Sequence, residues 1–138
     1  MSLFKVFDIA GAALSAQTVR LNTTASNLAN AETVSASEQD AYRARHPVFQ
    51  TVLARTTGGQ PSVAGVRVAG IVEDASPIQK QYQPGHPLAD AQGYVYTSNV
   101  NVVEEMVNMI AASRNYQNNV EIMNTSKQLL LATLRLGR

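Results

Sequence analysis

The chain has 138 residues, the length of one domain or of a small domain that carries extended arms. Its formal net charge of +1 gives no bulk attraction to nucleic acid or to anionic lipid. Cysteine is absent, which excludes disulfides, thiolate metal sites and a cysteine nucleophile.

The first predicted element is a long helix over residues 3–29. Ser2 is a suitable N-cap, and Asn30 suits the left-handed position at which many helices end. Large apolar side chains recur every seven residues with small side chains beside them, a narrow seam that lets another helix come close. The large residues of this seam are Phe7, Leu14, Leu21 and Leu28.

The same N-terminal stretch resembles a secretory signal only in part. Asp8 interrupts its apolar run, its positive region is the single Lys5, and the helical pattern continues past the small-residue "ALSA". No apolar run approaches the ~20 residues needed to span a bilayer. We therefore expect no lipid insertion and, if the protein is exported, no cleaved signal peptide.

The middle segment, residues 34–97, is expected to be extended and rich in β structure. Residues 46–55 and 62–74 are β-branched and alternating, and the "TTGGQP" between them reads as a hairpin turn. Three prolines exclude helix from residues 76–99, where "YVYT" is a possible last strand.

The C-terminal segment, residues 98–138, predicts a second long helix over about 101–135. Ser98, Asn99 or Asn101 can cap its start, and Gly137 can end it. Apolar residues spaced by seven and by four form a continuous stripe along it. The expected interface positions are Val102, Met106, Met109, Tyr116, Val120, Met123, Leu130 and Leu134.

Two charged residues of this helix, Arg114 and Glu121, lie seven apart on one face but are too far apart to pair directly. Either could serve a neighbouring subunit, and the alternative for each is a solvated surface charge.

The expected fold class is mainly α with a small β element. The N- and C-terminal helices pair as an α-helical coiled coil, and the middle segment contains a short β-hairpin. One partner helix covers only part of the C-terminal stripe. We therefore predict that both ends are disordered or weakly paired in the free monomer and become ordered on assembly.

Sequence motifs for catalysis are missing. The chain has no P-loop, GxGxxG, GxSxG or HExxH motif. Glu104 and Glu105 are adjacent, so on a helix they point ~100° apart and cannot face each other as acid and base. His46 and His86 each precede a proline and lack acidic or histidine neighbours at ligand spacing. We expect no enzyme activity, no catalytic residue, no metal site and no cofactor.

Several stretches resemble the bacterial flagellar axial proteins. They are "LNTTASNLANAET" (21–33), "SNVNVVEEMVNMIAASRNYQNNVEIMN" (98–124) and "LLLATLRLG" (129–137). The short length and "QYQPGHPLADAQGYVYTSNVNVVEEM" (81–106) resemble the proximal members of the basal-body rod family in particular. The chain departs from the family pattern at residues 11–13 and 41–43, which leaves the conformation of residues 34–47 open.

The resemblance implies a structural subunit of the proximal rod, in a helical tube that transmits torque from motor to hook. It implies partners among the proximal and distal rod proteins, the protein at the junction of rod and MS ring, and the flagellar type III export apparatus. It also implies a periplasmic place in the basal body. Asn22, Asn27 and Asn30 would then supply hydrogen bonds where an inner helix ends among other subunits.

Two other interpretations remain open. One is a distal-rod or hook subunit, against which the short length argues. The other is a self-contained coiled-coil adaptor, which would form a discrete oligomer with folded ends at low concentration.

Overall fold

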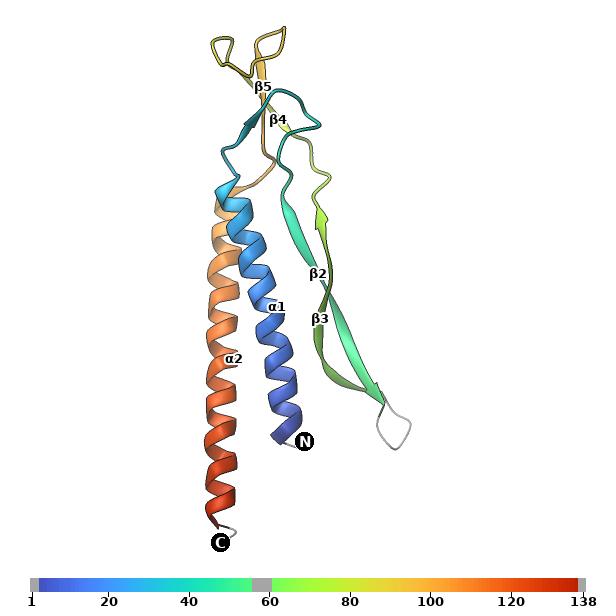
Figure 1. Ribbon diagram of the computed structural model, residues 1–138, viewed down its shortest axis with the longest axis vertical. Coiled ribbons are helices and arrows are strands. Elements are labelled where there is room, and N and C mark those ends of the chain that lie inside the picture. The colour runs from blue at the N-terminus through green and yellow to red at the C-terminus, as the bar shows by residue number, and fades with distance from the viewer. Residues whose placement is uncertain (1–2, 56–60, 137–138) are drawn as a thin grey trace.

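A computed structural model describes residues 3–55 and 61–136. Helix α1 spans Leu3–Ala29 and helix α2 spans Val102–Leu136, which confirms both predicted terminal helices. They lie side by side and run in opposite directions, so the start of α1 and the end of α2 share one end of the molecule (Figure 1). The predicted caps Ser2 and Gly137 and residues 56–60 of the predicted turn lie outside the described part.

The middle segment contains a long antiparallel hairpin. Strands β2 (Arg45–Arg55) and β3 (Pro61–Glu73) pair from Arg45 opposite Glu73 to Arg55 opposite Pro61, which confirms both predicted strands. Two shifts of register, at Val48/Phe49 and Val52/Leu53, interrupt the pairing. Such bulges increase the local twist, and the ribbon in Figure 1 is visibly twisted. A two-stranded ribbon is marginal in water by itself, so this hairpin depends on what it packs against.

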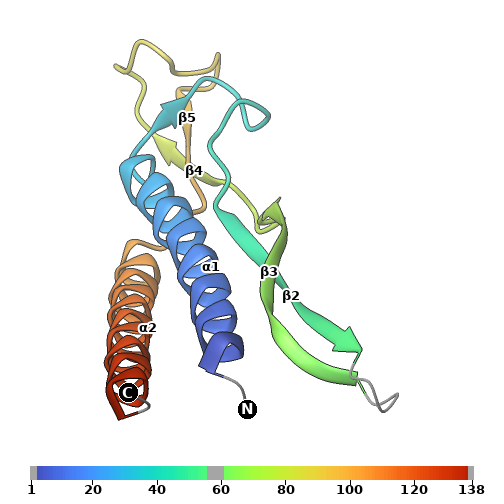
Figure 2. The ribbon, with the colours of Figure 1, turned by 60° about the horizontal axis from the view of Figure 1, so that its bottom comes forward.

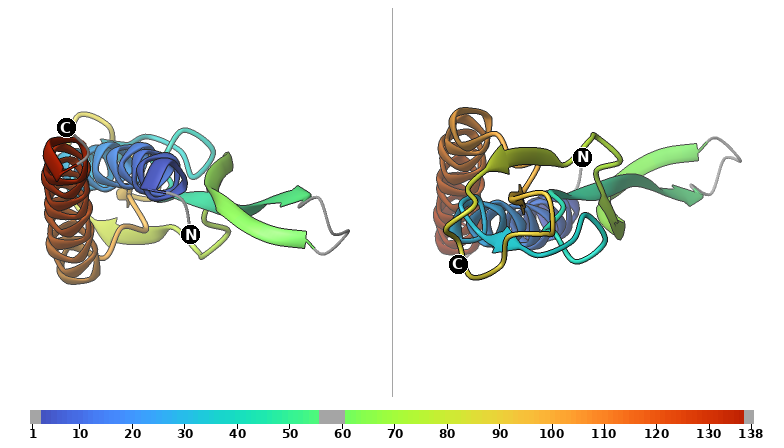
Figure 3. Two further views of the ribbon diagram at one scale, coloured as in Figure 1. Left: turned by 90° about the horizontal axis from the view of Figure 1, so that it is seen from below. Right: turned by 90° about the horizontal axis from the view of Figure 1, so that it is seen from above.

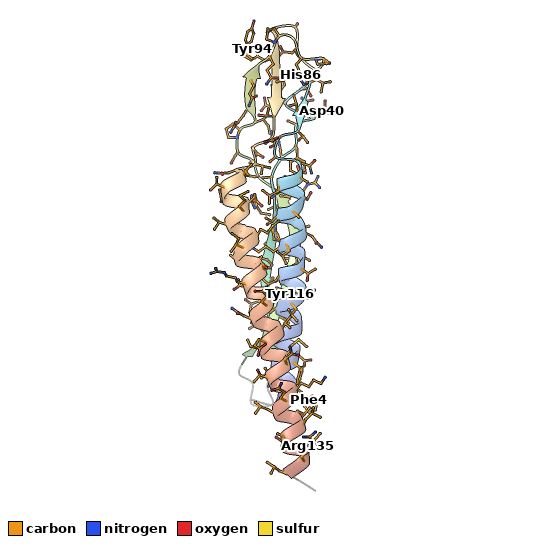
Figure 4. The ribbon with its side chains drawn as sticks, turned by 90° about the vertical axis from the view of Figure 1, so that its left-hand side faces the viewer. Phe4, Asp40, His86, Tyr94, Tyr116 and Arg135 are labelled. Carbon is orange, nitrogen blue, oxygen red and sulfur yellow. The ribbon has the colours of Figure 1, made fainter. Side chains whose placement is uncertain are left out.

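A second, three-stranded sheet caps the opposite end of the molecule. Its strands are β1 (Val34–Ser35), β4 (Gln79–Tyr82) and β5 (Tyr94–Thr97), in the antiparallel order β1-β5-β4. The predicted "YVYT" strand is confirmed as β5, whereas β1 and β4 were not distinguished from extended chain. Figure 4 shows His86 and Tyr94 at this end, and Phe4 and Arg135 at the other.

The loop between β4 and β5 is organised by Asp90. Its Oδ1 accepts hydrogen bonds from the backbone N–H groups of Gln92 (2.9 Å) and Tyr94 (2.8 Å). The bond from Tyr94 is the main reason why the pKa of Asp90 lies below its ordinary value. Gly93 has φ +84°, and a Cβ there would lie 3.0 Å from the Tyr82 ring, so this turn requires glycine.

Helix α1 is the central layer, between α2 on one side and the hairpin on the other (Figures 2 and 3). Its small residues make this possible: Ala10 and Ala16 are each only 3% exposed. A Cβ placed on Gly65 of β3 would lie 3.2 Å from the Cβ of Ala12. The small residues predicted to admit a second helix therefore also admit a β-ribbon.

At the helix ends, the structure corrects the predicted cap of α1 and identifies which of the candidate residues caps α2. Among the described residues no non-glycine residue has positive φ, so Asn30 is not a left-handed cap. Its side-chain amide instead donates to the carbonyl of Ser26 (2.8 Å), which also accepts the backbone N–H of Asn30 (3.1 Å). At the start of α2, Asn101 Oδ1 accepts the N–H groups of Val103 (3.1 Å) and Glu104 (3.3 Å), so Asn101 is the N-cap.

The molecule has an unusually large surface for its mass. Its accessible area is 9484 Å², whereas a compact monomer of 14.8 kDa exposes about 7,000 Å². The difference arises because three thin layers lie in a row and only the middle layer is covered on both sides (Figure 3). Among the described helices, none combines the length and the apolar character needed to cross a membrane.

Candidate subunit-contact surfaces

A polar junction joins α1 to the base of the hairpin. Asn27, in the last turns of α1, is completely buried. Its Nδ2 donates to the carbonyl of Arg45 (2.8 Å), and its Oδ1 accepts the N–H of the same residue (2.9 Å). The Tyr42 hydroxyl also donates to Oδ1 (3.0 Å). Asn27 thus binds the first residue of β2 as a neighbouring strand would, and fixes the direction in which the hairpin leaves α1.

Asn99 completes this junction from the chain that leads into α2. Its Oδ1 accepts the N–H of Ala44 (2.7 Å), and its Nδ2 donates to the carbonyls of Asp74 (3.3 Å) and Ser76 (3.1 Å). The Arg43 guanidinium donates to the carbonyl of Ser76 as well (3.2 Å). Two asparagine side chains therefore hold both strands of the hairpin to the ends of both helices. We name this set, Asn27, Tyr42, Arg45 and Asn99, the asparagine junction.

The asparagines near the end of α1 make hydrogen bonds inside the chain. Asn27 and the Nδ2 of Asn30 bond to residues of their own chain. Asn22 is exposed, and no hydrogen bond of its side chain falls within the described residues.

The seam between the two helices is centred on small and polar residues of α2. Glu105, Ala112 and Ser126 are its buried residues, and they are separated by multiples of seven. Arg20 of α1 donates to Asn108 Oδ1 (2.9 Å) across the seam. Gln17 Oε1 and Glu105 Oε2 are buried with no hydrogen-bond partner in the described part of the chain. Unpaired buried oxygens of this kind weaken a helix pair.

The expected interface positions divide into two groups. The large residues of α1 are all half-buried, as are four positions of α2: Phe7, Leu14, Leu21, Leu28, Met109, Val120, Met123 and Leu130. The other four positions remain exposed: Val102 (38%), Met106 (53%), Tyr116 (37%) and Leu134 (63%). Figure 4 labels Tyr116 midway along α2. One helix partner therefore covers only part of the predicted stripe.

A second apolar face of α2 has no cover within the described chain. On an ideal helix, Val107 and Asn118 point about 120–140° away from Ala112, which lies at the seam. Here two shallow hollows of about 520 and 410 Å³ share Asn118 and form one groove. We name it the outer groove. Its lining includes Val107, Ile110, Ala111, Arg114, Asn118, Glu121, Ile122 and Thr125.

The sequence gives a signal for the outer groove that heptad counting misses. Val107, Asn118 and Leu129 recur at intervals of eleven, which is close to three helical turns and keeps them on one straight line. Val107 is 61% exposed, Ile110 56% and Leu129 54%. Contiguous exposed apolar residues of this kind mark protein interaction sites.

The hairpin exposes further apolar side chains, on both of its faces. Leu53 is 61% exposed, Ile71 54% and Val72 50%. The molecule therefore presents apolar side chains at both edges of its row of layers, on α2 and on the hairpin.

Histidine and acidic residues are scattered over the described ranges 3–55 and 61–136. No cluster of three histidine or acidic residues there could hold a metal ion. His46 Nε2 lies 3.9 Å from Asp74 Oδ2, and the pKa of Asp74 is lowered mainly by a hydrogen bond from the Ser76 hydroxyl. These contacts are part of the hairpin base, and the outer groove and the exposed apolar residues of the hairpin are the candidate contact surfaces.

Comparison with known proteins places these features in a family. Residues 7–36 match the family model described as "Flagella basal body rod protein", and residues 91–136 match "Flagellar basal body rod FlgEFG protein C-terminal". The "Flagellar basal-body rod protein FlgC" of Yersinia enterocolitica is 54% identical over 138 residues, and that of Salmonella typhimurium 51%, with both chains covered completely. The protein of the same name from Buchnera aphidicola is 40% identical over 137 residues, 99% of each chain.

Proposed function

The chain belongs to the family of flagellar basal-body rod proteins FlgC, and on that premise we propose that it is a structural subunit of the proximal rod. It assembles into a helical tube that transmits torque from the motor to the hook. It acts through its surfaces and is not an enzyme. Relatives that match the whole chain carry the name FlgC, which favours the proximal rod over the distal rod and the hook.

The shape of the molecule supports assembly into a wall. A row of three layers with apolar side chains at both edges can continue sideways, because each edge still has surface to bury. An interface between two unlike edges, on subunits of one kind or of several kinds, repeats without closing on itself, and such repetition generates a helical assembly. A discrete coiled-coil adaptor would not require exposed apolar side chains on the hairpin.

The two helices, in residues 1–33 and 98–138, form the inner part of this wall in our proposal, and residues 34–97 form its outer part. The helices pair as a coiled coil once neighbours surround them. The half-buried large residues of α1 and the exposed residues Met106, Tyr116 and Leu134 of α2 then become interface positions.

Partners and location follow from the same proposal. The subunit contacts other rod components of the basal body, including proximal and distal rod proteins and the protein that joins the rod to the MS ring. It passes through the flagellar type III export apparatus without cleavage and assembles in the periplasm, without insertion into lipid, cofactor or metal.

A charge placed in the outer groove tests this function. We expect Ile110→Asp to be exported at the normal level but to abolish motility, because a neighbouring helix would have to bury the new carboxylate. Soft-agar motility of a strain that lacks its own copy of the chain, together with immunoblots of exported protein, makes the measurement. Ile110→Leu is the matched control, since it keeps an apolar side chain at the same exposed position. Normal motility of the Ile110→Asp variant would refute a role for this face in rod assembly.

A further inference from the structure

The outer groove contains one charge of each sign along an otherwise apolar and amide-lined path. Arg114 lines its first hollow and Glu121 lines its second. Neither side chain makes an ion pair or a hydrogen bond with another residue of the described chain. Seven residues of helix separate them, which is about 10.5 Å along the axis.

A helix that covers the groove must place an opposite charge near Arg114 and near Glu121. Apolar side chains placed over Arg114 and Glu121 would leave two charges desolvated and unpaired, which costs several kcal/mol. The covering helix therefore needs a carboxylate opposite Arg114 and a cation opposite Glu121, at the same spacing of about 10.5 Å. A parallel helix meets this need when an acidic residue precedes a basic residue by seven positions, and an antiparallel helix when the order is reversed.

The helices of this chain do not offer the parallel pattern. The residues seven positions after Asp8, Glu104, Glu105 and Glu121 are Ser15, Ala111, Ala112 and Gln128. The reversed pattern occurs once, in Arg114 and Glu121 themselves. The hairpin cannot substitute for a helix, since its one carboxylate, Glu73, already pairs with Arg45 at 3.4 Å.

A second copy could thus pair with both charges only if its α2 ran antiparallel, with each Arg114 facing the other copy's Glu121. That arrangement has two-fold symmetry, so it closes as a dimer and cannot continue into a tube.

We propose that the outer groove is occupied by a helix of a different protein, which places an acidic residue against Arg114 and, seven positions away, a basic residue against Glu121. This inference rests on the proposed function, because it is the open tube that excludes the closed dimer. The charge pattern makes the groove specific for a second kind of subunit, whereas the apolar residues around it provide the buried area.

Charge-swap variants test the proposal when each replaces the wild-type copy of the chain in a strain that is otherwise motile. The variants are R114E, E121R, the double swap R114E/E121R and the neutral pair R114Q/E121Q. We expect each single reversal to lower the number of completed basal bodies about tenfold or more, and the double swap to be no better than the worse single variant. The neutral pair should lie between these variants and the wild type. Immunoblots of exported protein control for export.

The double swap separates the two kinds of occupant. If two copies met antiparallel, the double swap would restore both ion pairs, so recovery of basal bodies to the wild-type number would overturn the proposal. Equal numbers of basal bodies for all variants would overturn it too. A strain without the chain that still swims would instead contradict the proposed function.

Sedimentation of the purified wild-type chain gives a second measurement that does not depend on assembly. We expect a monomer at about 10 μM, because the groove does not suit a second copy. A dimer that R114E dissociates and the double swap restores would overturn the proposal.

Discussion

At the scale of single residues, the sequence indicates which side chains matter but not what they bind. The asparagines at the end of α1 stand out in "LNTTASNLANAET", and the structure gives Asn27 a central place in the asparagine junction. Its partner Arg45 lies 18 positions further along the chain, so no local pattern could have identified it. Local hydrogen bonds can be predicted from the sequence, because the capping by Asn101 follows from its position before the helix.

Replacing Asn27 tests the asparagine junction. Asn27→Leu keeps the approximate size but leaves the N–H and C=O of Arg45 without partners in a buried site, and removes the acceptor of the Tyr42 hydroxyl. We expect a loss of about 2–4 kcal/mol in the free energy of unfolding. Urea unfolding followed by tyrosine fluorescence measures it, with Tyr42 at the site as one of the five tyrosines of the chain. The matched control is Asn22→Leu at an exposed position, and equal stability of both variants would contradict the role of Asn27.

At the scale of elements, periodicity located both helices well and assigned their faces less well. The seven-residue repeats predicted 3–29, and the structure has α1 at Leu3–Ala29. The repeats could not reveal that the hairpin also packs on α1, because strands pair over long sequence distances that leave no trace in a helix pattern. They could not show the centre of the α2 seam either, since Glu105 and Ser126 are polar and hydropathy does not select them.

The contact between the hairpin and α1 makes a prediction of its own. Gly65→Val adds a Cβ that would meet Ala12 at 3.2 Å, and the φ of +152° at this position is strained for any L side chain, so β3 must move away from the helix. Overpacking of this kind costs about 1–3 kcal/mol, which corresponds to roughly fivefold or greater opening of the hairpin. Limited trypsin digestion should then cleave after Arg67 at least about fivefold faster than in the wild type. Gly70→Val is the control, because nothing lies within 4 Å of a Cβ there. Unchanged cleavage of the Gly65 variant would show that the close packing has no energetic role.

At the scale of the whole molecule, the large exposed area connects the fold to its proposed use. The prediction that the ends of the chain bury their apolar side chains mostly against other molecules agrees with the bare face of α2, where Val107 and Leu129 remain more than half exposed. For α1 the prediction is too broad, because α1 is covered on two sides by its own chain. The family resemblance and the two helices could be predicted from the sequence. The row of three layers could not, because it depends on tertiary packing that leaves no local sequence pattern.

Amide hydrogen exchange of the purified monomer tests the central claim that α2 gains its stability from neighbouring subunits. The account predicts fast exchange across residues 102–136 in the free chain at micromolar concentration, and strong protection of the same amides in isolated basal bodies. Residues 3–29 should be only weakly protected in the free chain, and their protection should decrease toward the N-terminus. Strong protection of both 3–29 and 102–136 in the solitary monomer would contradict the claim.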